Sequence, residues 1–201
     1  MLKKMVVLAT AVAALVAFAV PASASAAWNW THGGVKPKEG QNFTHPFEGT
    51  VGWSAGQGGG MLGSIYCGTK ATITTEGPTK AQVTQWESNV STCVGKGWFA
   101  CSMSSATRNV SWTITIEEVF GSPVLRFTKP GGNITFVEEV ASPCSGPPIE
   151  NKWESFTATP TLDANGKITS LELAGWSSPQ FAYMEKALAP VGSLVLGLKK
   201  F

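Results

Sequence analysis

The sequence predicts an all-β protein, and three observations lead to that prediction. Charged residues make up only 14% of the chain, while glycine accounts for 22 of its 201 residues, a composition typical of extracellular β-proteins. Apolar and polar residues alternate along 110–118, which is the period of a half-buried strand. Turn-forming sequences at 130–132 and 163–166 separate further strand-like segments. Strands and turns at this spacing predict an antiparallel β-sandwich or barrel-like domain.

The N-terminus has the three-part pattern of a secretory signal peptide. Lys3 and Lys4 precede an apolar run over 5–20, and Ala24-Ser25-Ala26 forms a cleavage site. The alternative is a retained anchor helix, but the run is shorter than the ~20 residues that a membrane span needs. We therefore expect residues 1–26 to be removed and the protein to be secreted, with no membrane span left after cleavage.

The remaining chain is predicted to have two parts. Residues 27–46 are rich in glycine, proline, asparagine and lysine and show little periodicity, so we expect an extended or disordered arm. Residues 47–201 are predicted to form a single antiparallel β domain of roughly eight to ten strands. Within this domain, 179–189 has helix formers and apolar residues at helical spacing, which predicts a short C-terminal helix that ends at Pro190.

The charge balance excludes some classes of partner. The chain has 15 basic and 13 acidic side chains, and removal of Lys3 and Lys4 with the signal peptide makes the two numbers equal. A neutral protein exerts no long-range attraction on nucleic acid or on an anionic membrane. We therefore expect no nucleic-acid partner, and the expected partner is a cell-wall glycan or another extracellular protein.

The four cysteines are expected to form disulfides, because the protein is expected to be exported. Four cysteines allow three pairings. The short, glycine-containing loop after Cys93 favours Cys93–Cys101, which leaves Cys67–Cys144 as the second bridge. A four-thiolate zinc site is the alternative, but the spacing contains no Cys-x-x-Cys pair, so no metal site is predicted.

Few residues could carry catalysis, and we predict no catalytic residue and no cofactor. Histidine occurs only at His32 and His45, and the single aspartate, Asp163, lies in a turn sequence, so a Ser-His-Asp triad has little support. The two histidines could form a metal pair, but no Asp or Cys lies near them in the sequence. We therefore expect no metal there.

A glycan-active hydrolase is the main alternative function, because a secreted β-protein could use two glutamates across one cleft. The candidate carboxylates are Glu117, Glu118, Glu138, Glu139, Glu154 and Glu172. Adjacent glutamates on a strand point to opposite faces, so such pairs are more typical of solvated strand ends. A purely structural envelope protein is a third alternative.

The eight tryptophans give the best indication of function. Trp98 and Phe99 lie in the small loop expected between the second and third cysteines, and Trp28 and Trp30 lie in the expected arm. Exposed aromatic rings stack on sugars and anchor protein interfaces. We therefore predict a secreted or cell-wall-associated, non-enzymatic protein that binds a ligand through these four residues, with core packing as the alternative for Trp98.

One stretch resembles a known group of proteins. Ser91–Cys101, followed by Val110–Ile114 and accompanied by Cys67 and Cys144, resembles uncharacterised secreted proteins of soil actinobacteria over residues 47–145. In those proteins the strand more usually has Leu-Pro-Trp where this chain has Val-Ser-Trp. The resemblance implies a bacterial, exported, disulfide-containing β-fold, and it implies no activity.

Overall fold

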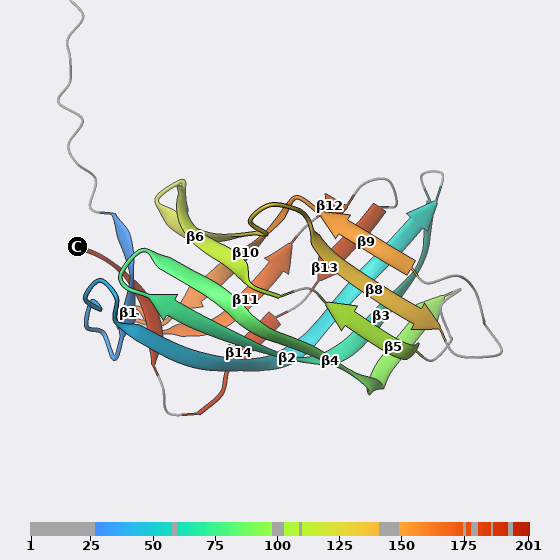
Figure 1. Cartoon of the computed structure of the whole chain (residues 1–201), viewed down its shortest axis with the longest axis horizontal. Helices are drawn as coiled ribbons and strands as arrows, with labels where there is room; N and C mark the ends of the chain where they lie inside the picture. The colour runs from blue at the N-terminus through green and yellow to red at the C-terminus, as the bar shows by residue number, and fades with distance from the viewer. Residues whose placement is uncertain are drawn as a thin grey trace, which may run out of the picture.

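The computed structural model in Figure 1 describes residues 27–57, 60–97, 103–108, 110–140, 149–174, 176–177, 181–185, 187–192 and 195–201. Every strand pairing in this part of the chain is antiparallel, and no helix occurs in it. The predicted all-β class is therefore confirmed. Within the same residues, no helix is of the length and hydropathy needed to cross a membrane.

The described residues form fifteen strands. They are β1 (Trp28–His32), β2 (Asn42–Gln57), β3 (Gly60–Glu76), β4 (Lys80–Gly97), β5 (Met103–Arg108), β6 (Trp112–Val119), β7 (Ser122–Thr128), β8 (Ile134–Val140), β9 (Ile149–Trp153), β10 (Ser155–Leu162), β11 (Ile168–Ala174), β12 (Trp176–Ser177), β13 (Phe181–Glu185), β14 (Ala187–Pro190) and β15 (Leu196–Lys200).

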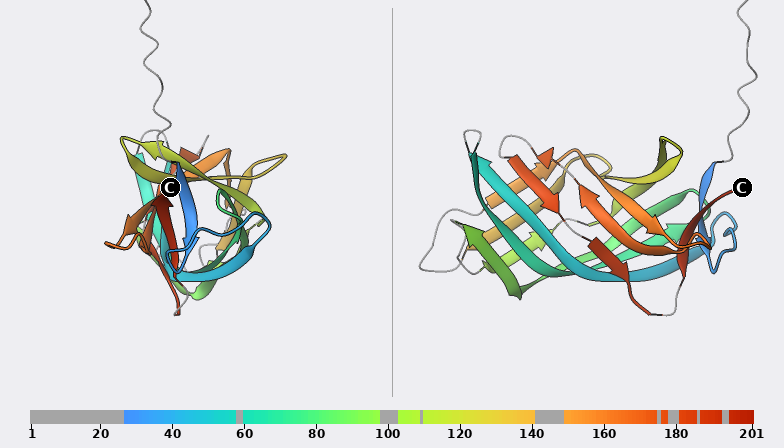
Figure 2. Two further views of the ribbon diagram at one scale, coloured as in Figure 1. Left: turned by 90° about the vertical axis from the view of Figure 1, so that its left-hand side faces the viewer. Right: turned by 180° about the vertical axis from the view of Figure 1, so that it is seen from behind.

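The largest sheet closes on itself. Its strands follow the order β12-β13-β2-β14-β11-β10-β7-β6-β4-β3, and β3 pairs again with β2. The strands from β2 round to β3 therefore form a continuous hydrogen-bonded circuit, which we call the closed sheet. In the end-on view of Figure 2 these strands surround a common axis, and β1 and β15 lie across one end. A closed sheet has no free edge for most of its length.

Alternate side chains of the closed sheet fill its interior. Trp112 and Ile114 of β6 are fully buried, which confirms the period-two pattern along 110–118. Aromatic rings dominate the centre, with tilted, edge-on and stacked contacts at ring-centroid separations of 4.5 to 6.5 Å. The closed sheet contributes the rings of Trp86, Trp112, Phe127 and Phe156, and a separate three-stranded sheet of β5, β8 and β9 contributes those of Phe136 and Trp153. Rings in these arrangements stabilise one another beyond the burial of their area.

Both predicted turns adopt the backbone that their sequences indicate. Gly131 and Gly166 have positive φ angles of 75° and 80°. The Asp163 carboxylate accepts hydrogen bonds from the backbone N–H groups of Asn165 and Lys167, at 2.8 and 2.9 Å. A side chain that bonds backbone groups two and four residues ahead fixes a tight turn.

The segment expected as an arm instead belongs to the fold, so that prediction is wrong. Trp28–His32 forms β1 and pairs with β15, and residues 42–46 are the start of β2. Burial provides the physical reason, because the Trp30 side chain is 0% exposed and the Trp30 N–H donates to the Pro78 carbonyl at 2.7 Å. Removing an indole ring from water outweighs the weak local preference of a glycine-rich sequence.

The predicted C-terminal helix is also wrong. In place of a helix over 179–189, the structure has β13 and β14, both of which pair with β2. β13 pairs with residues 52–56 of β2, and β14 pairs with 47–49. The long strand β2 has backbone groups to satisfy along its whole edge, and Phe181 and Tyr183 are residues that strands favour. Tertiary pairing therefore overrides helix propensity.

The disulfide pairing differs from the prediction as well. Cys67 of β3 is bonded to Cys93 of β4, which excludes both Cys93–Cys101 and Cys67–Cys144. The reason lies in the register, because Tyr66 pairs with Val94 whereas Gly68 pairs with Asn89, so residues 90–93 bulge opposite Cys67. Residues 93–97, expected at the start of a small hairpin, are instead the end of β4, whose long hairpin partner is β3. Cys101 and Cys144 lie outside the described residues.

Candidate functional site

The end of the molecule that carries β1 and the C-terminus contains a cleft of about 310 Å³, which we call the notch. Its lining residues are Ala27, Trp28, Thr79, Ile116, Glu117 and Glu118. They come from three segments far apart in the sequence: the start of β1, the turn between β3 and β4, and the second half of β6. The notch therefore exists only when these three segments have come together.

The notch arises because β6 extends past its neighbour β4. The pairing between these strands starts at Lys80 and Thr115, so residues 116–119 of β6 pair with β7 alone. The turn at 77–79 and the first residues of β1 border the edge left open. The hydrogen bond from Trp30 to Pro78 holds β1 against this turn. An unpaired strand edge that other segments border is suited to recognition.

Trp28 forms one wall of the notch. Its side chain is half-buried, and the Lys200 ammonium lies 5.3 Å from the ring centroid, within the range of a cation–π interaction. Lys200 Nζ also donates to Glu118 Oε1 at 2.9 Å. The indole Nε1 has no hydrogen-bond partner within the described part of the chain. This nitrogen is itself buried, so a molecule in the notch meets the exposed part of the Trp28 ring and not its N–H group.

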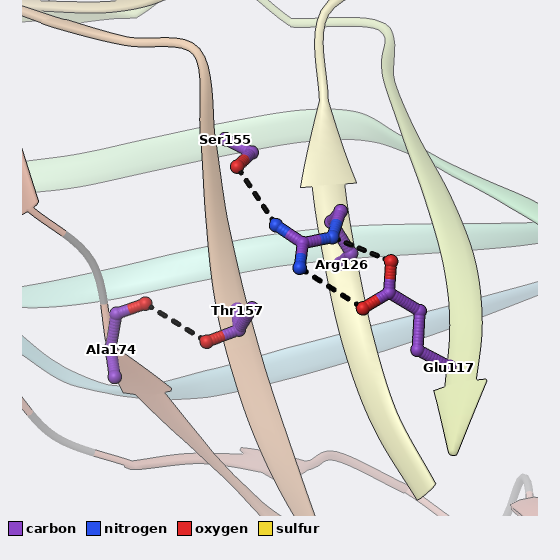
Figure 3. Close-up of polar contacts among 5 residues, drawn as sticks. All are labelled: Glu117, Arg126, Ser155, Thr157 and Ala174. Carbon is purple, nitrogen blue, oxygen red and sulfur yellow. Dashed lines mark hydrogen bonds and ion pairs between the residues drawn. The ribbon is translucent and has the colours of Figure 1, made fainter. Parts of the chain in front are cut away.

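Glu117 is held by an arginine on the neighbouring strand, as Figure 3 shows. Arg126 Nε and Nη2 donate to Glu117 Oε1 and Oε2 at 2.6 and 3.0 Å, and Nη1 donates to Ser155 Oγ at 3.1 Å. The hydrogen bonds and positive charge of Arg126 lower the pKa of the Glu117 carboxyl. Glu117 is therefore a fixed negative charge at neutral pH.

These groups define what the notch can do chemically. It offers part of an indole ring, the Thr79 hydroxyl and two carboxylates whose charges are balanced by Arg126 and Lys200. Such a set can stack against an apolar face and accept hydrogen bonds from hydroxyl groups. A volume of about 310 Å³ is at the lower end of the range for small-molecule pockets.

The four aromatic residues predicted to bind a ligand do not all lie at the notch. Trp28 lines the notch, whereas Trp30 is completely buried and cannot contact a ligand, so its prediction is wrong. Trp98 and Phe99 lie outside the described residues. The difference between the first two tryptophans arises because β1 lies across the end of the closed sheet, with Trp30 in its core.

Among the candidate carboxylates, the fold brings Glu117 and Glu118 to the notch. They are neighbours on one strand and do not face each other across two walls. Glu172 lies on β11, where it pairs with Thr159 and Ala187. The side chains of Glu138 and Glu139 lie outside the described part of the structure. The arrangement of two opposed carboxyls that glycoside hydrolysis requires is not formed by Glu117 and Glu118.

The two histidines form a second polar group, at the end of the closed sheet. His32 stacks on Phe43 with ring centroids 4.0 Å apart, and it lies 5.3 Å from His45. Burial, and to a lesser extent the neighbouring His32, lower the pKa of His45 to about 4. His45 is therefore neutral at physiological pH. The described residues contain no group of three or more side chains that could hold a metal ion.

Sequence reasoning missed the partners of the notch residues. Arg126 and Lys200 bind the two glutamates from other strands. The contact between Arg126 and Glu117 depends on a two-residue turn at Phe120-Gly121, which pairs Val119 with Ser122 and so sets the register of β6 and β7. Recognition of that turn in the sequence would have placed Arg126 near Glu117.

A serine motif in the sequence was also missed. Gly52-Trp53-Ser54-Ala55-Gly56 has the Gly-x-Ser-x-Gly spacing of a hydrolase nucleophile, which works on a sharp turn from strand to helix. Here the five residues lie within β2 and pair with β3. The backbone that this chemistry needs is therefore not present at Ser54.

Comparison with known proteins gives no relative: no family model matches the chain, and neither the curated proteins nor the solved structures contain a significant match.

Proposed function

We propose that this chain is exported and acts outside the cell as a non-enzymatic binding protein, with the notch as its glycan-binding site. The observation that carries the proposal is Trp28, whose half-buried ring borders a cleft that also contains two carboxylates. A tryptophan placed in this way presents an apolar ring surface to a ligand, beside carboxylates that can accept hydrogen bonds.

A glycan unit fits the chemistry of the notch. Sugar rings have an apolar face, which stacks on indole, and a rim of hydroxyls, which carboxylates and threonine can bind. The cleft is of a size for one small ring rather than for a long polymer segment. The export signal expected over residues 1–26 and the Cys67–Cys93 disulfide support a location outside the cell.

The hydrolase alternative is weaker because of the electrostatics of the notch. Glycoside cleavage needs one carboxyl with a raised pKa, which can act as a general acid. The pKa of Glu117 is lowered by Arg126, so this group holds no proton to donate at neutral pH. Glu117 is better suited to accept hydrogen bonds from ligand hydroxyls.

The proposal is tested by measuring retention of the purified chain from Ala27 onward on insoluble cell-wall polysaccharide. We expect Trp28→Ala to reduce the affinity at least tenfold and Trp28→Phe to retain part of it, because an aromatic face remains. Thr159→Ala, on the exposed face of β10, is the control and should bind as the unmodified protein does.

A melting temperature close to that of the unmodified protein shows that the Trp28 variants are folded. Retention that is equal in all variants would remove the notch as the binding site. Retention on an extracellular protein but on no polysaccharide would replace the glycan with a protein partner. Recovery of the protein only from inside the producing cells would contradict the proposed export.

A further inference from the structure

The expected cleavage site and the notch coincide in space. Cleavage after Ala26 would make Ala27 the first residue of the exported chain, and Ala27 is one of the residues that line the notch. Cleavage at this bond replaces a neutral peptide N–H by an α-ammonium group. A positive charge would thus appear in a cleft that already contains Glu117 and Glu118.

The local structure holds Ala27 in place. The Asn29 side chain is 4% exposed, and its Nδ2 donates to the Ala27 carbonyl at 2.6 Å. The next residue, Trp28, pairs with Lys200, the residue whose ammonium binds Glu118. Ala27 is therefore the residue next to Trp28, and Trp28 pairs with the lysine that binds Glu118.

Glu118 has capacity for a second cation. Lys200 binds its Oε1, and within the described residues Oε2 takes part in no hydrogen bond or ion pair. Glu117, by contrast, uses both carboxylate oxygens to bind Arg126. A carboxylate can accept hydrogen bonds at both oxygens, so Glu118 is the better partner for a new ammonium.

We propose that cleavage after Ala26 creates an α-ammonium on Ala27 that pairs with Glu118, so that the notch reaches its final form only in the processed protein. This inference rests on the proposed export. In the unprocessed chain the Ala27 nitrogen is an amide bonded to Ala26, carries no charge and leaves Glu118 Oε2 without this partner. Processing thereby fixes the start of β1 and changes the charge of the ligand site.

The test compares four purified chains: one that begins at Ala27, one that retains Ser25-Ala26 ahead of it, and the Glu118→Gln variant of each. At pH 6.5 we expect the chain that begins at Ala27 to melt about 1–3 °C above the extended chain. In the Glu118→Gln pair this difference should disappear. It should also disappear at pH 10, where the ammonium has lost its proton.

The α-amino pKa gives a second readout, measured by NMR on the ¹⁵N-labelled alanine. A neighbouring carboxylate favours the charged form, so the pKa should lie about half a unit or more above the ordinary range of 7.7–8.0. The Glu48→Gln variant is the matched control, because Glu48 also pairs with an exposed lysine, Lys70, but lies on β2 away from the notch. It should leave the pKa unchanged.

Two results would overturn the inference: equal melting temperatures of the two chains at pH 6.5, or a difference that persists in Glu118→Gln. Its failure can be distinguished from failure of the proposed function. N-terminal sequencing of the exported protein that shows a start other than Ala27 would end this inference and leave export and binding intact. Loss of the glycan interaction would leave the melting difference intact.

Discussion

His45 of β2 and His32 of β1 lie with their ring centroids 5.3 Å apart, where β1 crosses the end of the closed sheet. The His45 side chain is 1% exposed, and neither of its ring nitrogens has a hydrogen-bond partner in the part of the chain that the structure describes. This contact joins the first strand to a buried histidine of the closed sheet.

The first prediction concerns stability in acid. The pKa of His45 is lowered from 6.5 to about 4 by burial and by His32. Between these values the unfolded chain binds a proton at His45 that the folded chain does not, so stability is fully present above pH 6.5 and falls toward pH 4. The loss should be on the order of 3 kcal/mol. Urea unfolding at pH 7.5, 5 and 4 measures it, and His45→Leu should show a smaller decrease over the same interval.

The second prediction concerns the disulfide. Cys67 and Cys93 are 26 residues apart, and loss of a bridge that closes such a loop costs about 3 kcal/mol in the chain-entropy model. We expect Cys93→Ser to lower the melting temperature by about 6–12 °C. Peptide mapping of the oxidised protein should recover Cys67 linked to Cys93. A bridge from Cys93 to Cys101 in that map would contradict the structure.

The third prediction concerns the pair formed by Glu117 and Arg126. Arg126 lowers the pKa of Glu117, so Arg126→Ala should let that pKa rise toward the ordinary glutamate value in an NMR titration. The stabilisation is present above the unfolded pKa of Glu117 and is lost as the pH falls through its folded pKa. Because both side chains are more than a third exposed, the contribution should be only about 0.5 kcal/mol. Arg126→Lys should retain part of the pKa shift, because the charge remains.

The fourth prediction concerns the turn between β6 and β7. Phe120 has a φ of 50°, is fully exposed, and precedes Gly121 with a φ of 82°. Asparagine tolerates this backbone far better than phenylalanine, and the exposed ring gains nothing from burial. Phe120→Asn should therefore raise the free energy of unfolding by about 0.5–1 kcal/mol in urea. A decrease would show that the ring makes a stabilising contact.

Local sequence patterns were sufficient to predict those strands and turns whose conformation depends only on neighbouring residues. The alternation along 110–118 and the turn at 163–166 were predicted correctly, because side-chain period and backbone preference act within a few residues. The turn at Phe120-Gly121 was missed, because a phenylalanine at its first central position does not have the usual composition of such turns.

The errors occur where distant pairing decides the outcome. Residues 181–185 have helix-forming character, yet the edge of β2 makes them a strand. Cys93 pairs with Cys67 because of a bulge in a long hairpin, which spacing alone does not reveal. Trp28 and Trp30 occupy the same expected arm, and only the docking of β1 buries one and leaves the other in the notch.

The pairing of β1 with β15 has a consequence for how the protein matures. These strands are the first and last that the structure describes, so their contact spans nearly the whole sequence and must await the final residues. Contacts between remote segments make folding slow. In the export proposed above, with the N-terminus crossing the membrane first, β1 could not pair with β15 until residues 196–200 had also crossed, so this end of the fold would form last.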